Sequence, residues 1–200
     1  MSKHIERRAF AAELRVVRTE GEKPVIRGHA AVFNALSEDL GGFREVIAPG
    51  AFRNAVPRDD VRALFNHDAN LILGRSRPGQ PSTLRMVEDE TGLSIEIDPP
   101  DTQYARDLMV SMDRGDITQM SFGFSVTKAG QKWEENGDGT HTRTLTDVRL
   151  YDVSPVTFPA YPQTDVALRS LTEFKAEVVE TPSAVVRRDY ERELLLREKS

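Results

Sequence analysis

A mainly β fold is predicted, in which a closed or nearly closed antiparallel barrel is decorated by a few helices. Short runs of β-branched and aromatic residues recur along the chain, separated by the Gly, Pro, Asn and Asp residues that form turns. Residues 120–126 alternate between large apolar and small side chains, which is the period of a strand. Only residues 101–115 show a strong helical period. Many short strands with few helices are typical of barrels and related α+β folds.

The predicted strands are spread over the first 157 residues. The first two are separated by the polar stretch 19–23 and are expected to form a hairpin, and the polar turn 134–139 marks an exposed hairpin tip. A single helical turn is predicted over 48–55, where the chain passes through Pro49 and Gly50. The strand-like stretches are residues 10–18, 24–33, 61–68, 71–75, 84–87, 92–97, 117–126 and 144–157.

One longer helix is predicted to begin after Asp101 or Thr102, either of which can cap its first turn, and to end at Gly115. Its apolar residues recur at intervals of three and four, so that they share one face. They are Tyr104, Ala105, Leu108, Met109 and Met112.

The composition limits the chemistry that the chain can perform. With 200 residues, the chain has the length of one compact domain with a short appendage, so a single active site is expected. The absence of cysteine excludes disulfides, thiolate nucleophiles and Cys-ligated zinc. A net charge of −5 argues against nucleic acid as a partner, and no apolar run reaches the roughly 18 residues of a membrane span. The first apolar stretch is short and broken by Glu13 and Arg15, so no export signal is expected.

The character of the sequence changes near residue 171. From Thr172 onward the chain is rich in Glu, Arg and Lys, and Val185 to Lys199 has the pattern of an amphipathic or solvated helix. We therefore expect a folded domain over 1–171 and a detachable charged tail over 172–200.

Ser121 is the first candidate for covalent chemistry. The alternation over 120–126 places large apolar residues on one face of a strand and Ser121, Gly123 and Ser125 on the other. A face of small residues leaves room for a substrate backbone. On the pattern alone, however, an outward-facing serine without a catalytic role is the commoner interpretation, and no Gly-x-Ser-x-Gly nucleophile elbow is present.

A serine hydroxyl needs a base to take its proton, and the chain offers four histidines. His4 lies in a charged terminus and His141 beside a polar loop, whereas His29 lies inside an apolar strand, where a structural histidine is expected. His67 differs because it ends a hydrophobic strand, at a rim where side chains of several strands can converge. It is therefore the candidate general base.

A third residue is expected to orient the histidine, and Asp152 is the candidate. Alternation in its strand places it on the same face as Val148 and Leu150, where an unpaired carboxylate would be costly. A pairing with an arginine or with backbone amides is an equally good interpretation, and Asp68 and Glu45 remain alternatives for the orienting role. No spacing typical of a metal site or of a phosphate-binding loop occurs, so neither a metal nor a cofactor is expected.

Five ordered blocks, spread over roughly residues 8–170, resemble the HK97-like prohead protease family of tailed bacteriophages and related prophages. The five blocks in this order indicate the family far more specifically than any single block does. The blocks are residues 28–34, 43–52, 64–68, 115–117 with 120–124, and 151–162.

The resemblance implies a function and a location. In that family the histidine after Phe-Asn and the serine before Phe-Gly-Phe are base and nucleophile, which correspond to His67 and Ser121. The family is similar in fold to the herpesvirus maturation proteases, a barrel with surrounding helices. The implied substrates are the scaffolding segment of the major capsid protein, or a separate scaffold, and the protease itself. Contacts with the portal and with further copies of the chain are also implied.

The implied place of action is the host bacterial cytoplasm, inside the assembling procapsid. The tail over 172–200 would then serve recruitment into the shell and be removed by self-cleavage. The alternative function is that of a non-catalytic scaffold or capsid-assembly protein with the same fold.

Overall fold

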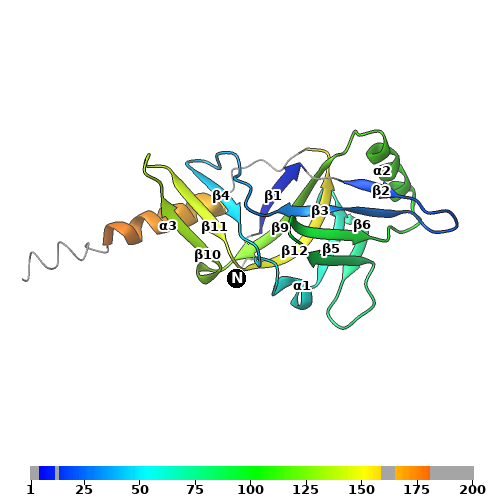
Figure 1. Cartoon of the computed structure of the whole chain (residues 1–200), viewed down its shortest axis with the longest axis horizontal. Coiled ribbons are helices and arrows are strands. Elements are labelled where there is room, and N and C mark those ends of the chain that lie inside the picture. Colours follow the sequence, from blue (N-terminus) through cyan, green and yellow to red (C-terminus); the bar gives the residue numbers. More distant parts are fainter. Residues whose placement is uncertain (1–4, 12–13, 159–164, 181–200) are drawn as a thin grey trace, which may run out of the picture. The chain divides into compact units, whose positions relative to one another are not determined.

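The computed structural model describes residues 5–11, 14–158 and 165–180, and the chain divides into two units, one up to Thr164 and one from Asp165 (Figure 1). The strands of the described residues are β1 (Glu6–Ala11), β2 (Arg15–Val17), β3 (Val25–Val32), β4 (Phe43–Ile47), β5 (Val61–Phe65), β6 (Asp68–Ser76), β7 (Leu84–Glu88), β8 (Gly92–Ile97), β9 (Gln119–Val126), β10 (Gln131–Glu135), β11 (His141–Leu145) and β12 (Val148–Val156). The helices are α1 (Ala55–Arg58), α2 (Gln103–Asp113), the 3₁₀ turn η1 (Lys128–Gly130) and α3 (Asp165–Glu180).

These strands form three sheets. A five-stranded sheet has the order β1-β9-β12-β5-β6, a four-stranded sheet the order β2-β3-β8-β7, and a three-stranded sheet the order β10-β11-β4. The hairpin predicted at the start of the chain exists only in part, because β2 pairs with β3 whereas β1 pairs with β9 in another sheet. The predicted tip over 134–139 is confirmed, since it joins the antiparallel strands β10 and β11.

The predicted mainly β class with few helices is confirmed, but the closed antiparallel barrel is wrong for the described strands. β1 and β6 are the two ends of the five-stranded sheet and do not pair with each other. Two pairs are parallel, β12 with β5 and β11 with β4. Alternation and turn residues indicate where strands lie and which face is apolar, but they do not report which strands pair.

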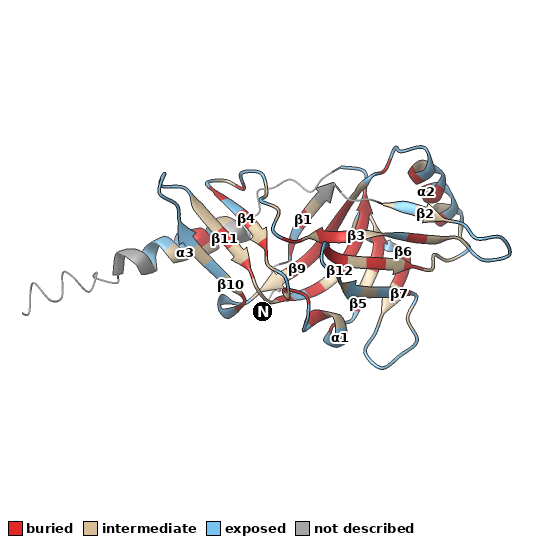
Figure 2. Ribbon diagram, in the orientation of Figure 1, coloured by how far each residue is buried: buried red, intermediate tan, exposed pale blue. Residues whose placement is uncertain are grey.

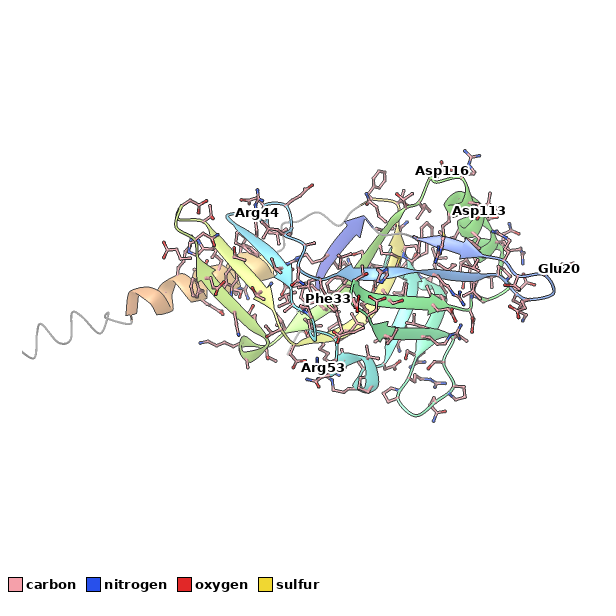
Figure 3. The ribbon with its side chains drawn as sticks, viewed as in Figure 1. Glu20, Phe33, Arg44, Arg53, Asp113 and Asp116 are labelled. Carbon is pink, nitrogen blue, oxygen red and sulfur yellow. The ribbon has the colours of Figure 1, made fainter. Side chains whose placement is uncertain are left out.

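The core lies between the five-stranded and four-stranded sheets, where Figure 2 shows buried residues along β3, β9 and β12. Four aromatic rings in the core contact one another in a row. The ring of Phe52 stacks on Phe33 at 6.2 Å and meets Phe122 edge-on at 5.4 Å, and Phe122 stacks on Phe124 at 4.9 Å. Figure 3 shows Phe33 in the interior, whereas the labelled charged residues are exposed. The core therefore fixes β9 through its large side chains.

The longer predicted helix is confirmed as α2. It begins after Thr102 and is followed by Gly115, whose φ of +80° is the left-handed conformation that glycine adopts readily at a helix end. Of the predicted apolar face, Ala105, Leu108, Met109 and Met112 are buried and Tyr104 is partly buried. The predicted turn over 48–55 is confirmed as a non-helical turn, in which Ala51 N donates to the carbonyl of Ala48 and Arg53 N to that of Gly50, both at 3.1 Å, and it leads into α1 (Ala55–Arg58).

A buried group of four charged residues connects β1 with β4 and β11. Arg8 donates to Glu45 at 2.8 Å and to Glu6 at 2.9 Å, and Arg143 donates to Glu6 at 2.7 Å and to Glu45 at 3.0 Å. All four are at most 4% exposed. Because two carboxylates face two guanidinium groups, the network is neutral and its members satisfy one another, as burial of charge requires.

Removal of one charge from this network is expected to destabilise the fold. Glu6→Gln leaves two buried arginines with one carboxylate, and breaking such a network costs about 3–5 kcal/mol of unfolding free energy. Urea denaturation measures this loss. The same substitution at exposed Glu20 should change the unfolding free energy by less than about 0.5 kcal/mol.

The network also predicts a dependence on pH. Burial raises the pKa of Glu6, but the hydrogen bonds and charges of Arg143 and Arg8 outweigh it and lower this pKa below its ordinary 4.5. A carboxyl whose pKa is lower in the folded than in the unfolded state stabilises the folded state at pH values above the unfolded-state pKa. This contribution is lost as the pH falls through the folded-state pKa. Stability of the unaltered chain should therefore fall more steeply below pH 4.5 than that of Glu6→Gln. If the unfolding free energies of the two proteins, measured by urea denaturation, fell equally with pH below 4.5, this prediction would be contradicted.

The second unit contains α3, which spans Asp165–Glu180 and therefore continues across the boundary expected at residues 171 and 172. The helical pattern predicted over 185–199 lies outside the described residues. None of the helices in the described part of the chain has the length and hydrophobicity that a membrane span needs.

Candidate active site

Ser121 lies in β9, an inner strand of the five-stranded sheet between β1 and β12. As the alternation predicted, Met120, Phe122 and Phe124 point into the core and are 0% exposed. Ser121 therefore points to the opposite face, where its partners on the neighbouring strands are Ala9 of β1 and Ser154 of β12. The small residues of this face are thus fixed in place by the large residues of the other.

His67 lies in the two-residue turn that joins β5 to β6. Asn66 and His67 have φ values of +53° and +58°, so both adopt the left-handed conformation that tight hairpin turns require and that residues other than glycine rarely adopt. The turn is tied to the end of β12: Asn66 N donates to the carbonyl of Pro155 at 3.0 Å, and Thr157 N donates to Asn66 Oδ1 at 2.8 Å. These bonds hold the strained turn, and with it the imidazole, against the strand that carries Asp152.

Asp152 reaches the face of Ser121 through a β-bulge. Leu150 pairs with Phe124 and Asp152 with Gly123, so Tyr151 is an extra residue in β12. Side chains of directly opposed residues share a face, which places Leu150 with the core and Asp152 with Gly123. The prediction that Asp152 shares a face with Val148 and Leu150 is therefore wrong, because one extra residue reverses the alternation.

Gly123 leaves the space that the Asp152 carboxylate occupies. A Cβ added at Gly123 would lie 2.2 Å from Oδ2 and 3.2 Å from Cγ of Asp152. No side chain can approach a carboxylate oxygen this closely. The site therefore requires glycine at position 123, because any side chain there would collide with the Asp152 carboxylate.

The structure brings Ser121, His67 and Asp152 into one hydrogen-bonded series. His67 Nδ1 contacts Asp152 Oδ1, and His67 Nε2 lies 2.8 Å from Ser121 Oγ. An ionised carboxylate only accepts hydrogen bonds, so Nδ1 must carry the proton. Nε2 is then free to accept the hydroxyl proton of Ser121, which is the arrangement that activates a serine for nucleophilic attack.

The alternatives to these residues are occupied elsewhere. Asp68 accepts the backbone N–H of Asn70 at 2.8 Å, and Glu45 belongs to the buried arginine network. His29 lies 2.8 Å from Asp89, away from Ser121, and His141 lies in β11 of another sheet. His4 is outside the described residues. Among the described residues no group of His, Asp and Glu could hold a metal ion.

Ser121 is covered in this conformation. It is 0% exposed, and the side chain of His67 is 8% exposed. Attack requires the substrate carbonyl to come within roughly 3–3.5 Å of the nucleophile. The room predicted beside Ser121 for a substrate backbone is therefore closed in this conformation, and nucleophilic attack by Ser121 would require a movement that uncovers its hydroxyl.

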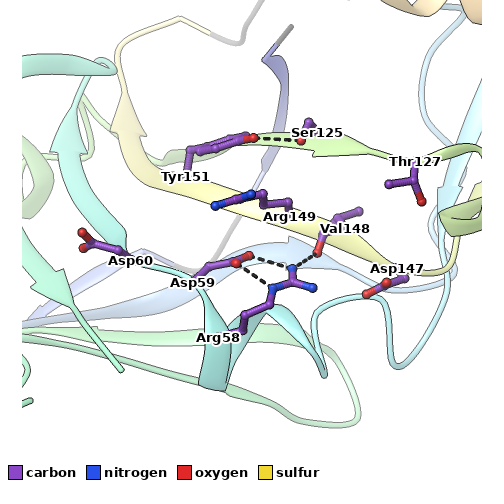
Figure 4. A pocket seen from close by; sticks show the side chains of 9 residues that line it. All are labelled: Arg58, Asp59, Asp60, Ser125, Thr127, Asp147, Val148, Arg149 and Tyr151. Carbon is purple, nitrogen blue, oxygen red and sulfur yellow. Dashed lines mark hydrogen bonds and ion pairs between the residues drawn. The ribbon is translucent and has the colours of Figure 1, made fainter. Parts of the chain in front are cut away.

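A pocket of about 570 Å³ lies farther along the Ser121 face, toward the far end of β9 (Figure 4). Within it Arg58 is held by Asp59 at 2.8 Å and by the carbonyl of Val148 at 3.1 Å. The hydrogen bond from Arg75 lowers the pKa of Asp60, which keeps this carboxylate ionised. The pocket is therefore polar and of mixed charge. It is lined by Arg58, Asp59, Asp60, Ser125, Thr127, Asp147, Val148, Arg149 and Tyr151.

Sequence reasoning missed two features of the site. Ser154 is 0% exposed and donates to Asp152 Oδ1 at 2.8 Å, but its place beside Ser121 depends on strand pairing. The bulge at Tyr151 has no sequence signature of its own. The run of positive-φ residues at Asn66 and His67 could have been found, because two polar residues between two strand-like stretches are a hairpin signal.

Comparisons with known proteins identify the family of this chain and a solved structure of similar fold. A family model described as caudovirus prohead serine protease matches residues 10–177. The prohead protease of Enterobacteria phage HK97 is 31% identical over 153 residues, which cover 74% of this chain and 61% of that protein. The match thus spans less than two thirds of the relative's length. The solved structure of the bacteriophage T4 capsid assembly protease, gp21, is similar in fold, with a TM-score of 0.50 at 8% identity over 78% of this chain and 99% of that one.

Proposed function

This chain belongs to the caudovirus prohead serine protease family, and on that premise we propose that it is a serine endopeptidase of procapsid maturation. The observation that carries the proposal is the series Ser121, His67 and Asp152, which joins two strands and a turn by hydrogen bonds. In the proposed roles, Ser121 is the nucleophile, His67 the general base and Asp152 the residue that orients the imidazole.

The proposed reaction is acyl transfer. His67 Nε2 takes the proton of Ser121 as Oγ attacks the scissile carbonyl, and it returns the proton to the leaving amine. Asp152 stabilises the imidazolium that forms between these steps. A water molecule, activated in the same way, then releases the acyl group and restores Ser121.

The pocket beyond Ser125 supports a substrate that extends along β9. A strand advances about 3.3 Å per residue, so Ser125 lies about 13 Å from Ser121. An extended peptide advances at the same rate. The pocket would therefore receive a substrate side chain about four residues from the scissile bond.

The proposed substrates are the scaffolding segment of the major capsid protein, or a separate scaffold protein, and the chain itself. Cleavage would occur inside the assembling procapsid, in the bacterial cytoplasm, where the portal and further copies of the chain are the proposed neighbours. The charged segment 172–200 would recruit the enzyme into the shell and then be removed.

Co-expression with the major capsid protein of the same genome tests the function. Intact mass spectrometry should find both the capsid protein and this chain shortened, and both full-length when Ser121 is replaced by alanine. Ser111→Ala, the same change in α2 where the hydroxyl bonds to the carbonyl of Asp107, is the matched control and should still cleave. A capsid protein that assembles without shortening, and without loss of the tail, would favour the non-catalytic scaffold function.

A further inference from the structure

Ser154 is a second serine buried beside Ser121 on the same face of the sheet. The two residues are directly opposed on the antiparallel strands β9 and β12, and both are 0% exposed. They nevertheless have different partners: Ser121 contacts the imidazole of His67, whereas Ser154 donates to the carboxylate of Asp152. The pairing therefore places a hydroxyl at each end of the His67–Asp152 pair.

The hydrogen bond of Ser154 falls on the oxygen that also faces His67. Oδ1 of Asp152 accepts from Ser154 Oγ at 2.8 Å and contacts His67 Nδ1. Two donors that converge on one oxygen fix both the position of the carboxylate and the direction in which it accepts. Hydrogen bonds to an ionised group are stronger than neutral ones, particularly where water is excluded.

The other oxygen of the same carboxylate depends on the glycine at position 123. Oδ2 occupies the space that a Cβ would fill there, since such a Cβ would lie 2.2 Å from it. Gly123 therefore leaves room for the carboxylate, and Ser154 holds it by a directional bond. Asp152 itself is 7% exposed, so water has little access to replace that bond.

We propose that Ser154 is a positioning residue that fixes the Asp152 carboxylate, and through it the tautomer and orientation of His67. This inference rests on the proposed function, because it assigns Ser154 a part in activating Ser121. Ser154 is not a second nucleophile, since its hydroxyl donates to Asp152 and the base nitrogen of His67 faces Ser121.

A double-mutant cycle tests whether Ser154 acts through Asp152. With the purified major capsid protein as substrate, Ser154→Ala should lower the initial cleavage rate roughly 10- to 100-fold, because a small misplacement of a catalytic group has effects of this size. In the background of Asp152→Ala the same change should have almost no further effect, because the residue through which it acts is gone. Equal losses in both backgrounds would show that Ser154 acts independently of Asp152 and would overturn the proposal.

A spectroscopic readout tests the positioning without any substrate. The NMR resonance of the His67 Nδ1 proton reports its hydrogen bond to Asp152. This resonance should shift or broaden in Ser154→Ala and remain unchanged in Ser111→Ala, and thermal unfolding should show that both variants are folded. An unchanged resonance in folded Ser154→Ala overturns the proposal.

The two measurements separate this inference from the proposed function. Cleavage that persists in folded Ser121→Ala would end the proposed role of Ser121 as nucleophile, while a shifted His67 resonance in Ser154→Ala would still show that Ser154 positions the imidazole. Cleavage that depends on Ser121 but is unaffected by Ser154→Ala would end only the role of Ser154.

Discussion

Replacement of Ser121 with alanine is expected to lower the rate of capsid-protein cleavage by about 10⁴- to 10⁶-fold, to the limit of detection. The hydroxyl oxygen Oγ is the only non-hydrogen atom removed, and it is the atom that His67 Nε2 contacts at 2.8 Å. The core face of β9 is formed by its neighbours Met120 and Phe122, which remain in place. The variant should therefore fold and bind substrate, but it should form no acyl-enzyme.

The control for this result is Ser111→Ala, which changes the same atom type on α2 and should cleave at the rate of the unaltered chain. Circular dichroism and thermal unfolding establish that Ser121→Ala is folded. Residual cleavage above about 1% in a folded Ser121→Ala preparation would exclude Ser121 as the nucleophile, given the magnitude expected for this class of residue.

Replacement of Asp152 with asparagine is expected to lower the rate by about 10⁴-fold. The amide has nearly the shape of the carboxylate, but its NH₂ group can donate to His67 Nδ1. That interaction favours the tautomer with the proton on Nε2, which then cannot accept the proton of Ser121. The loss should thus appear in the chemical step, with binding of the capsid protein retained.

Asp68→Asn is the matched control, because Asp68 directly follows His67 in the chain yet bonds to Asn70 instead. It should retain the cleavage rate of the unaltered chain, because the carboxylate of Asp68 bonds to Asn70 and takes no part in the series of Ser121, His67 and Asp152. Gly123→Ala tests the position of the Asp152 carboxylate while its charge stays unchanged. The new Cβ would lie 2.2 Å from Oδ2, so it should displace the carboxylate and lower the cleavage rate about 100-fold. If Asp68→Asn were inactive and Asp152→Asn active, the orienting residue would be Asp68.

Local pattern predicted much of the site. The alternation over 120–126 predicted that Ser121 and Gly123 share a face opposite the phenylalanines. The structure confirms it, since Phe122 and Phe124 belong to the hydrophobic core, whereas Ser121 meets His67 and Gly123 meets Asp152. The end of a hydrophobic strand predicted that His67 lies at the rim of a sheet, and the structure places it in the turn between β5 and β6. These features depend on the spacing of neighbouring residues, which the sequence displays directly.

Pairing between distant strands could not be predicted in this way. Asp152 was selected from a face that it does not occupy, because the extra residue Tyr151 reverses the alternation of β12. The bulge is accompanied by a hydrogen bond between the hydroxyls of Tyr151 and Ser125, which lie far apart in the chain. Ser154 was missed for the same reason, since its place opposite Ser121 follows from register and not from spacing.

Sheet closure was the other feature that local pattern could not decide. Each strand showed turn residues at its ends and an apolar face, which fits a barrel and separate sheets equally well. The parallel pairing of β12 with β5 is what brings the turn of His67 toward Asp152, because β5 leads directly into that turn.

The central claim is that His67 activates Ser121, and covalent labelling tests it most directly. In the reaction with a fluorophosphonate, Ser121 Oγ forms a bond to phosphorus, fluoride leaves, and the hydroxyl proton passes to His67. Tandem mass spectrometry of chain that is actively cleaving capsid protein should locate the adduct on Ser121, and His67→Ala should abolish it. Two results together would contradict the account: an adduct on a serine other than Ser121, and cleavage of capsid protein by the Ser121→Ala variant.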